Sequence, residues 1–174
     1  MIRSSKVSDM PAITAIYAHH VLFGTGTFEI EPPSLEDMSS RREEVLARGL
    51  PYLVVEIDGQ VKGYAYCNWF KPRQAFRFSA EDSIYLADDI AGKGWGKKLL
   101  MQLCDEAEKA GLRKMIAVIG DSENAGSIGV HASLGFQHVG TISGCGWKFN
   151  RWLDIVMMEK ELGLGQNQPP PDGD

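Results

Sequence analysis

Residues 91–100, AGKGWGKKLL, interleave glycines and lysines just before an apolar, helix-like run. A helix N-terminus offers unpaired N–H groups and the positive end of the helix dipole, so it attracts anions. Glycine lets the backbone approach an anion closely and adopt a positive φ. Lys93, Lys97 and Lys98 add positive charge. The segment therefore predicts an anion-binding turn, best suited to a pyrophosphate.

The spacing of these residues excludes two familiar nucleotide-binding motifs. A GxGxxG dinucleotide fingerprint needs a glycine where Lys97 stands. A P-loop needs Gly at 91 and Ser or Thr at 98, where the chain has Ala91 and Lys98. The turn also follows a predicted hairpin rather than the first strand. A phosphate ligand of another class is therefore expected.

Longer stretches around this turn resemble one family. IYLADDIAGKGWGKKLL, followed by ENAGSIGVHASLGF, is similar to the acetyl-CoA-binding half of the GNAT superfamily of N-acetyltransferases. That family's turn has Arg or Gln, then glycine three places on and glycine or alanine two places later. Gly94 and Gly96 match, and Ala91 replaces the Arg or Gln. FEIEPPSLEDM, FRFSAEDSIYL, AVIGDSENAGS and KFNRWLDIVMM resemble its phosphinothricin and methionine sulfone (sulfoximine) N-acetyltransferase branch, so the resemblance spans about residues 2–160.

The resemblance implies acetyl-CoA as cosubstrate, and no metal. Backbone groups near Tyr85 and Leu86 would hold the acetyl carbonyl and pantetheine, where the strand separates from its neighbour. Asn124 opens a short helix and would contact pantetheine, with simple helix capping as the alternative. The implied cofactor-binding residues are Ile84, Tyr85, Leu86, Gly92, Lys93, Gly94, Trp95, Gly96, Lys97, Asn124 and Ser127.

Acetyl transfer to an amine needs a base, stabilisation of the developing oxyanion, and a proton for the leaving thiolate. Glu81 matches a glutamate proposed as general base in the resembled branch, acting directly or through a water. Strand alternation turns Asp82 to the other face, so only one of these carboxylates is expected in the cleft, and we favour Glu81. His131 stands where many relatives carry a tyrosine that protonates the thiolate; the alternative is a packing histidine. A ping-pong route through Cys67 or Cys145 is not favoured, because no histidine lies at a diagnostic spacing.

The acceptor side is predicted from an arginine pair and an aromatic side chain. Arg73 and Arg77 precede Glu81 in an irregular segment and suit an anionic amino acid. The resemblance places Arg77 on a matching position and Phe28 in the substrate-side loop. The predicted substrate-binding residues are Phe28, Arg73 and Arg77.

The predicted function is therefore an acetyl-CoA-dependent N-acetyltransferase that acetylates the amine of a small amino acid or analogue by direct transfer in a ternary complex. The resemblance implies phosphinothricin, methionine sulfone and methionine sulfoximine as acceptors, and resistance to such compounds as a consequence. Two alternatives stay open. One is an acetyltransferase for another amine, such as a peptide N-terminus, a polyamine or an aminoglycoside. The other is a non-catalytic acyl-CoA-binding module.

The elements that must position these residues follow from periodicity and turn signals. Ser8 is predicted to cap a first helix, with Pro11 in its first turn, and Ser34 with Asp37 to form a capping box for a second helix ending near Arg48. Further helices are predicted at about 94–111 and 123–135, and strands at about 2–6, 52–57, 61–70, 82–87, 114–120, 136–142 and 152–162. Asp58-Gly59 joins two of the strands as a hairpin.

This order predicts an α/β fold: a mixed, twisted sheet of about six to seven strands flanked by helices, as in GNAT-like acyl-CoA acyltransferases. The sheet begins antiparallel and becomes parallel across the strand–helix–strand unit. A single acetyltransferase domain is expected over residues 1–162. Residues 163–174 are expected to be a disordered tail, because they are polar and rich in proline and glycine.

Composition sets the remaining limits. A net charge of -5 over 174 residues argues against a nucleic-acid partner. No apolar run approaches the roughly 18 residues of a membrane span, and the start lacks a signal peptide. The scattered Cys67, Cys104 and Cys145 fit a reduced, cytoplasmic protein. The resemblance implies a homodimer.

Overall fold

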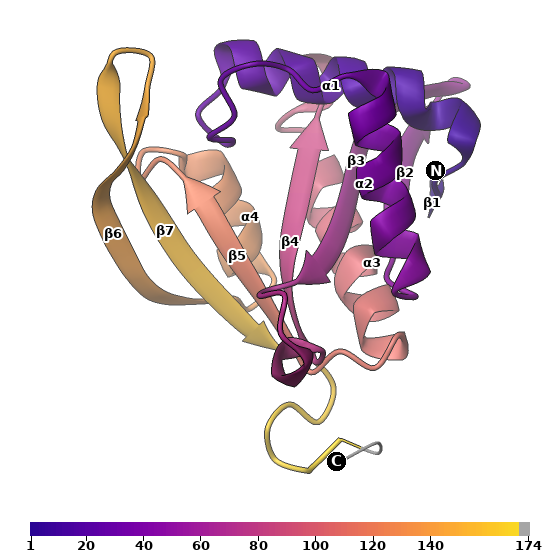
Figure 1. The fold of residues 1–174 in the computed structure, drawn as a ribbon, viewed down its shortest axis with the longest axis vertical. Helices are drawn as coiled ribbons and strands as arrows, with labels where there is room; N and C mark the ends of the chain where they lie inside the picture. The colour runs from indigo at the N-terminus through magenta and orange to yellow at the C-terminus, as the bar shows by residue number, and fades with distance from the viewer. Residues whose placement is uncertain (171–174) are drawn as a thin grey trace.

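Seven strands form one mixed sheet with helices on both faces in the computed structural model, which describes residues 1–170 (Figure 1). The strands lie in the order β1-β2-β3-β4-β5-β7-β6 and are β1 Ile2–Ser4, β2 Tyr52–Ile57, β3 Gln60–Trp69, β4 Ser79–Leu86, β5 Lys114–Gly120, β6 Gln137–Lys148 and β7 Arg151–Glu161. The helices are α1 Met10–Phe23, α2 Leu35–Ala47, α3 Trp95–Lys109 and α4 Ala125–Ser133, with short 3-10 turns η1 Val7–Asp9, η2 Gln74–Phe76 and η3 Asp88–Ile90. Only β4 and β5 pair in parallel among these neighbours. The predicted fold class is confirmed.

Local turn and cap chemistry accounts for the early boundaries. Asp58 and Gly59 adopt φ values of 50° and 75°, as the tight turn of the predicted β2–β3 hairpin requires. The Ser34 hydroxyl accepts a hydrogen bond from the Asp37 N–H at 3.1 Å, and the Asp37 carboxylate accepts one from the Ser34 N–H at 3.2 Å. The capping box predicted for α2 is therefore confirmed.

Several boundaries differ from the predictions: β1 ends at Ser4, and β4 already begins at Ser79. Ser8 does not cap α1, because it lies inside η1, where the Asp9 carboxylate accepts a hydrogen bond from the Lys6 N–H at 2.7 Å. β6 continues to Lys148, well beyond the predicted end. The sequence pattern did not show this second half, because register shifts in the pairing with β7 break the alternation that marks a strand.

The tail contains turns where the structure describes it. The Gly165 N–H donates to the Leu162 carbonyl at 2.9 Å, and the Asn167 N–H donates to the Leu164 carbonyl at 3.2 Å. The rest of the predicted disordered tail, residues 171–174, lies outside the described residues. Within residues 1–170, no helix has the length and apolar character needed to cross a membrane.

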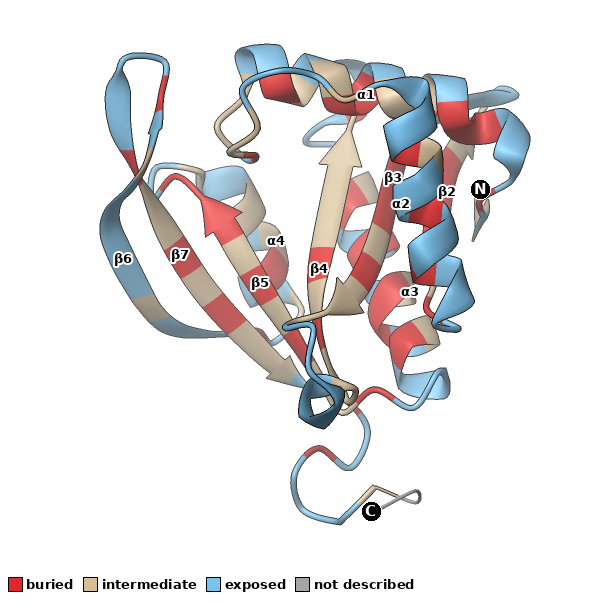
Figure 2. Cartoon of the chain, in the orientation of Figure 1, coloured by how far each residue is buried: buried red, intermediate tan, exposed pale blue. Residues whose placement is uncertain are grey.

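The core lies in two layers, one on each side of the sheet. α1 and α2 pack on one face of its first four strands, and α3 and α4 pack on the opposite face (Figure 1). Buried residues gather where these helices meet the sheet, whereas β6 is exposed along most of its length (Figure 2). The predicted apolar stripe of α3 is confirmed, since Leu99, Leu100, Leu103 and Ala107 are all 0% exposed.

The sheet opens at its centre. β4 pairs with β3 from Ala80 to Leu86, but it pairs with β5 only through Ser79, Ala80 and Glu81. Beyond Glu81 the two strands diverge (Figure 1). The β5-facing edge of β4 therefore carries backbone N–H and C=O groups without a strand partner.

Leu103→Ala tests the packing of α3, because the truncation leaves a cavity in a fully buried position. We expect the free energy of unfolding to fall by about 2–5 kcal/mol, measured by urea denaturation. Met101→Ala is the control on the same helix, because Met101 is 48% exposed. Equal losses in the two variants would contradict this packing.

Candidate active site

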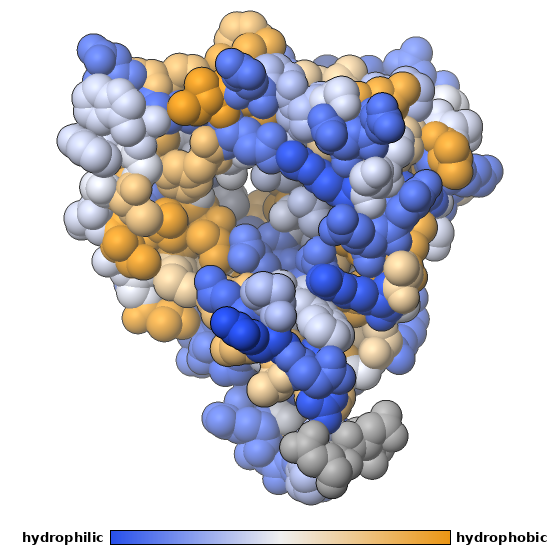
Figure 3. All heavy atoms as spheres, in the orientation of Figure 1, coloured by the Kyte–Doolittle hydropathy of each residue, from blue (hydrophilic) through white to orange (hydrophobic). Residues whose placement is uncertain are grey.

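A cavity of about 600 Å³ occupies the opening of the sheet, between the loop after α1, the strands β4 and β5, and the start of α4. The surface is hollowed at this position, with polar residues along the α2 side (Figure 3). Both Glu81 and Asp82 line the cavity. The expectation that only one of them would face the cleft is therefore wrong: the gap between β4 and β5 lets the cavity reach both faces of the sheet.

Glu81 lies on the β4 face that carries α1 and α2, at the point where the strands part. Burial raises the pKa of its carboxyl group, and the nearby charge of Asp82 raises it further. Lys71 acts in the opposite direction but does not cancel the shift. A carboxylate with a raised pKa accepts a proton from an amine more readily than an ordinary one.

Asp82 and His131 form a buried pair on the other face of β4. The imidazole Nε2 lies 3.1 Å from the Asp82 Oδ1, and the Nδ1 donates to the Ser127 carbonyl at 2.7 Å. Burial lowers the pKa of His131, but the hydrogen bond to Asp82 and the charge of its carboxylate outweigh this, so the pKa is raised. The other carboxylate oxygen of Asp82 is buried without a hydrogen-bond partner. Because both ring nitrogens face oxygen acceptors, the pair is arranged to retain a proton.

A second cavity of about 500 Å³ lies at the N-terminus of α3. Gly92 and Gly94 have φ values of 71° and 81°, and a Cβ atom on either would meet nothing within 4 Å. The N–H groups of the first turn of α3 have no acceptor within the helix. Gly96 lies against Leu86 and Val130, which brings α3 close to β4 and α4. This cradle fits the diphosphate that the sequence predicts here.

The two cavities meet. Ile84, Ser127 and His131 line both of them. His131 is the only titratable side chain among these three. An extended ligand anchored at α3 would therefore reach the larger cavity past His131 and the free edge of β4.

Most of the residues predicted to bind the cofactor line these cavities. Those on the smaller cavity are Ile84, Leu86, Gly92, Gly94, Gly96, Lys97 and Ser127, and those on the larger one are Ile84, Tyr85, Asn124 and Ser127. Lys93 and Trp95 line neither cavity. The Asn124 side chain caps α4 by accepting from the Ser127 N–H at 3.1 Å, so the capping role is present as well.

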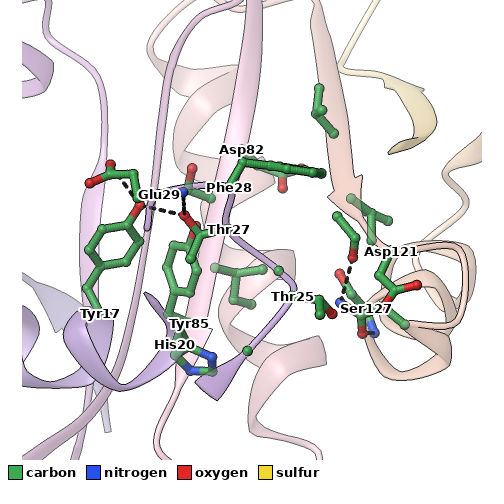
Figure 4. Close-up of a pocket in the computed structure, with 18 of the residues that line it drawn as sticks. Tyr17, His20, Thr25, Thr27, Phe28, Glu29, Asp82, Tyr85, Asp121 and Ser127 are labelled. Atoms are coloured by element: carbon green, nitrogen blue, oxygen red, sulfur yellow. Dashed lines mark hydrogen bonds between the residues drawn. The ribbon is translucent and has the colours of Figure 1, made fainter. Parts of the chain in front are cut away.

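The loop after α1 forms one wall of the larger cavity. Thr25, Thr27, Phe28 and Glu29 line the cavity (Figure 4). Of these, the resemblance places Phe28 and Glu29 in the substrate-side loop, and substrate contact was predicted for Phe28. Glu29 forms an ion pair with Arg41 at 2.5 Å and accepts from the Tyr17 hydroxyl at 3.0 Å. Arg41 also lines the cavity and was missed by the sequence reasoning, because nothing local distinguishes it within the polar helix α2.

The structure does not bring Arg73 and Arg77 to either cavity. They flank η2, an exposed segment beside the start of β4, whereas the loop that contains Phe28 lies at the other end of that strand (Figure 1).

The larger cavity is less acidic than its residues suggest. Glu29, Glu81, Asp82, Asp121 and Glu123 all contribute to its lining. Three of these carboxylates have cationic or imidazole partners: Arg41 pairs with Glu29, His131 with Asp82, and Arg151 with Asp121 at 2.7 Å. Of the other two, Glu123 is exposed just before α4, and Glu81 lies beside the gap between β4 and β5.

None of the three cysteines lines either cavity. Burial raises the pKa of Cys104 to about 12 and raises that of Cys67 as well, which keeps both as thiols near neutral pH. Cys145 is exposed on β6 and lines neither cavity. Among the described residues, no cluster of three or more His, Cys, Asp or Glu side chains suits a metal ion.

Comparison with known proteins agrees with this geometry. Residues 13–136 match the Acetyltransferase (GNAT) family. The chain is 47% identical to phosphinothricin N-acetyltransferase of Alcaligenes faecalis, over 97% of this chain and 86% of that protein. It is 38% identical to the L-methionine sulfoximine/L-methionine sulfone acetyltransferase of Pseudomonas aeruginosa, over 97% and 98%. A phosphinothricin acetyltransferase of the GNAT superfamily from Sinorhizobium meliloti, solved with acetyl-CoA, superposes with a TM-score of 0.96 at 41% identity, covering 99% of this chain and 94% of that one.

Asp82→Asn tests the buried pair, because it removes the carboxylate that raises the pKa of His131. In the folded chain His131 holds its proton more tightly than in the unfolded chain. The free energy that the protonated His131–Asp82 pair adds to folding is therefore fully present below about pH 6.5, and it is lost as the pH rises through the raised pKa of His131. We expect unfolding in denaturant to show a loss of about 1–3 kcal/mol below pH 6.5 or so, which shrinks at higher pH. The exposed Asp105→Asn is the control, and a loss that does not vary with pH would contradict the pairing.

Proposed function

This chain belongs to the GNAT family of acetyltransferases and is an acetyl-CoA-dependent N-acetyltransferase; we propose that its acceptor is the amine of a small amino acid or analogue such as phosphinothricin, methionine sulfone or methionine sulfoximine. The observation that carries this proposal is the meeting of two cavities at the gap beyond Glu81, one shaped for a diphosphate and one for a small acceptor.

The residues of the smaller cavity fit acetyl-CoA. The N–H groups of the first turn of α3, with Gly92 and Gly94 open to approach, would hold the diphosphate. The edge of β4 from Ser83 to Leu86, which has no strand partner, would hold the pantetheine arm and the acetyl carbonyl; at its end the Leu86 carbonyl lies 2.8 Å from the His20 Nε2. When bound, acetyl-CoA supplies the acetyl group as a thioester.

Glu81 is the proposed general base. Its carboxylate lines the acceptor cavity, beside the last residue pair between β4 and β5. Burial raises the pKa of this carboxyl group, which makes it a stronger acceptor for the proton of the amine. The adjacent β4 edge offers N–H groups to the oxygen that gains negative charge as the amine adds to the carbonyl. Amine deprotonation and oxyanion stabilisation thus come from neighbouring residues of one strand.

We retain His131 as the proposed proton donor to the leaving thiolate, although its ring nitrogens are hydrogen-bonded to the Ser127 carbonyl and the Asp82 carboxylate, so one of these bonds would have to break for the transfer. It is the titratable side chain shared by both cavities, and its raised pKa favours the protonated form. Asp82 orients the ring and offsets its charge at 3.1 Å.

An amino acid suits the acceptor cavity better than a polyamine does. Pairing with Arg41, His131 and Arg151 leaves few carboxylates of the cavity free to bind a polycation, and Glu81 can meet a single amine. The names of the relatives agree with this acceptor class. The predicted substrate role of Arg73 and Arg77 stays a proposal.

A homodimer is proposed through β6 and β7. β6 is an edge strand, and Val139, Ile142, Trp147 and Trp152 are each at least half exposed. Unpaired strand edges with large apolar side chains are surfaces on which a second copy can pack. The cytoplasmic location and the resistance activity stay predictions from the sequence.

Glu81→Gln tests the chemistry. We expect kcat/KM to fall by about 10²–10⁴, because the neutral amide cannot accept the amine proton. In the wild type, kcat/KM should fall as the pH drops through the raised pKa of Glu81, and Glu81→Gln should lose this dependence. Release of the coenzyme A thiol would be followed with phosphinothricin, methionine sulfone, methionine sulfoximine, a polyamine and a peptide as acceptors.

The exposed Glu44→Gln controls for a nonspecific effect of charge removal. Undiminished turnover by Glu81→Gln would rule out the base assignment. Wild-type turnover with the polyamine or peptide alone would overturn the acceptor class, and no turnover with any acceptor would favour a non-catalytic module.

Gly94→Ala tests the diphosphate site. A Cβ atom at its φ of 81° strains the start of α3, where N–H groups face the ligand. We expect calorimetry to show coenzyme A binding weakened by about tenfold or more. Gly111→Ala is the matched control, because Gly111 has a φ of 91° at the other end of the same helix. Equal affinities in both variants would refute the site.

A further inference from the structure

One buried lysine at the end of β6 forms hydrogen bonds to the loop that follows α1. The Lys148 Nζ donates to the Gly24 carbonyl at 2.9 Å and to the Thr27 carbonyl at 2.8 Å. Lys148 is only 5% exposed although it is the last residue of β6. A buried ammonium group must find acceptors, and here both are backbone oxygens of the loop.

The turn after Lys148 fixes where the lysine stands. Phe149 and Asn150 both adopt positive φ, at 50° and 58°, and close the β6–β7 hairpin with two residues. Lys148 pairs directly with Arg151 across this turn. The position of the ammonium group is therefore set by a short, rigid hairpin.

Two glycines shape the surface on which the loop lies. A Cβ atom at Gly146 of β6 would lie 2.2 Å from the Phe28 ring, and one at Gly120 of β5 would lie 2.3 Å from the Thr25 carbonyl oxygen. Phe28 extends from the loop across the cavity (Figure 4). The loop thus reaches β5 and β6 only because those positions carry no side chain.

We propose that Lys148 is a positioning residue for the acceptor: it holds the loop Gly24–Phe28 against β5 and β6, and so sets the wall of the acceptor cavity without touching the substrate. This inference rests on the proposed acceptor side of the larger cavity. Gly24, Thr25, Gly26, Thr27 and Phe28 all line that cavity, and none of them lines the cavity at α3. Losing the lysine therefore loosens the acceptor wall and leaves the coenzyme A cradle intact.

Lys148→Met tests this role, because methionine keeps the apolar stem and removes the donors. We expect the acceptor KM to rise by about tenfold or more, while the KM for acetyl-CoA changes by less than about twofold. Amide hydrogen exchange measured without substrate should speed up at residues 24–28 and stay unchanged in α3. Lys148→Gln keeps an uncharged NH₂ donor group on a shorter side chain, so it should give a smaller change in the same direction, and it replaces Lys148→Met if that variant does not fold.

Lys160→Met is the matched control. The Lys160 Nζ also donates to a backbone carbonyl, that of Leu134 at 2.5 Å, but it lies away from the loop. Equal rises in the two KM values, no larger acceptor effect than in Lys160→Met, or unchanged exchange at residues 24–28 would each overturn the proposal. If the wild type acetylates no amino-acid analogue, the proposed function fails, and the exchange measurement alone still decides whether Lys148 holds the loop.

Discussion

The parting of β4 from β5 after Glu81 is the constraint on which the site depends. A sheet paired along its full length would leave no free backbone groups and no passage between its faces. With only three residue pairs joining these strands, one edge of β4 is free for a ligand, and the opening joins the two cavities. Glu81, Asp82 and His131 lie together at that opening, on opposite faces of the sheet.

Most of the carboxylates at the opening are neutralised by a cationic or imidazole partner. Asp82 and His131 together carry no net charge when they share one additional proton, so the pair is tolerated at side-chain exposures of 3% and 2%. Arg41 and Arg151 neutralise two further carboxylates. Glu81 has no such cationic partner within the same network, and burial therefore acts on it most directly. Adjacent carboxylates on one strand therefore have different environments, as the proposed base role of Glu81 and positioning role of Asp82 require.

Much of the fold could be predicted because its signals are local. The Asp58-Gly59 turn, the Ser34 capping box and the α3 stripe each depend on residues a few positions apart. The anion-binding turn before α3 could also be proposed from the sequence, since its glycines and the helix start are adjacent in the chain. The end of β6 was missed because the irregular pairing near Ile142 and Gly146 breaks its alternation.

The acceptor wall and the charge pairs could not be predicted in the same way. Asp82 and His131 are 49 residues apart, and Arg41 meets Glu29 across 12 residues and a change of element. No periodicity relates such positions; only the completed fold does. The arginines before Glu81 looked suited to an anion in sequence, but η2 holds them outside the cavity walls.

Lys148 lies 124 positions after Gly24 and 121 positions after Thr27, the two loop residues whose carbonyl groups it binds. Closing so long a loop is entropically costly, so such contacts form late in folding. During translation, residues 24–28 leave the ribosome long before the hairpin that seats them. The loop therefore cannot take its final position against β5 and β6 until the β6–β7 hairpin has been synthesised.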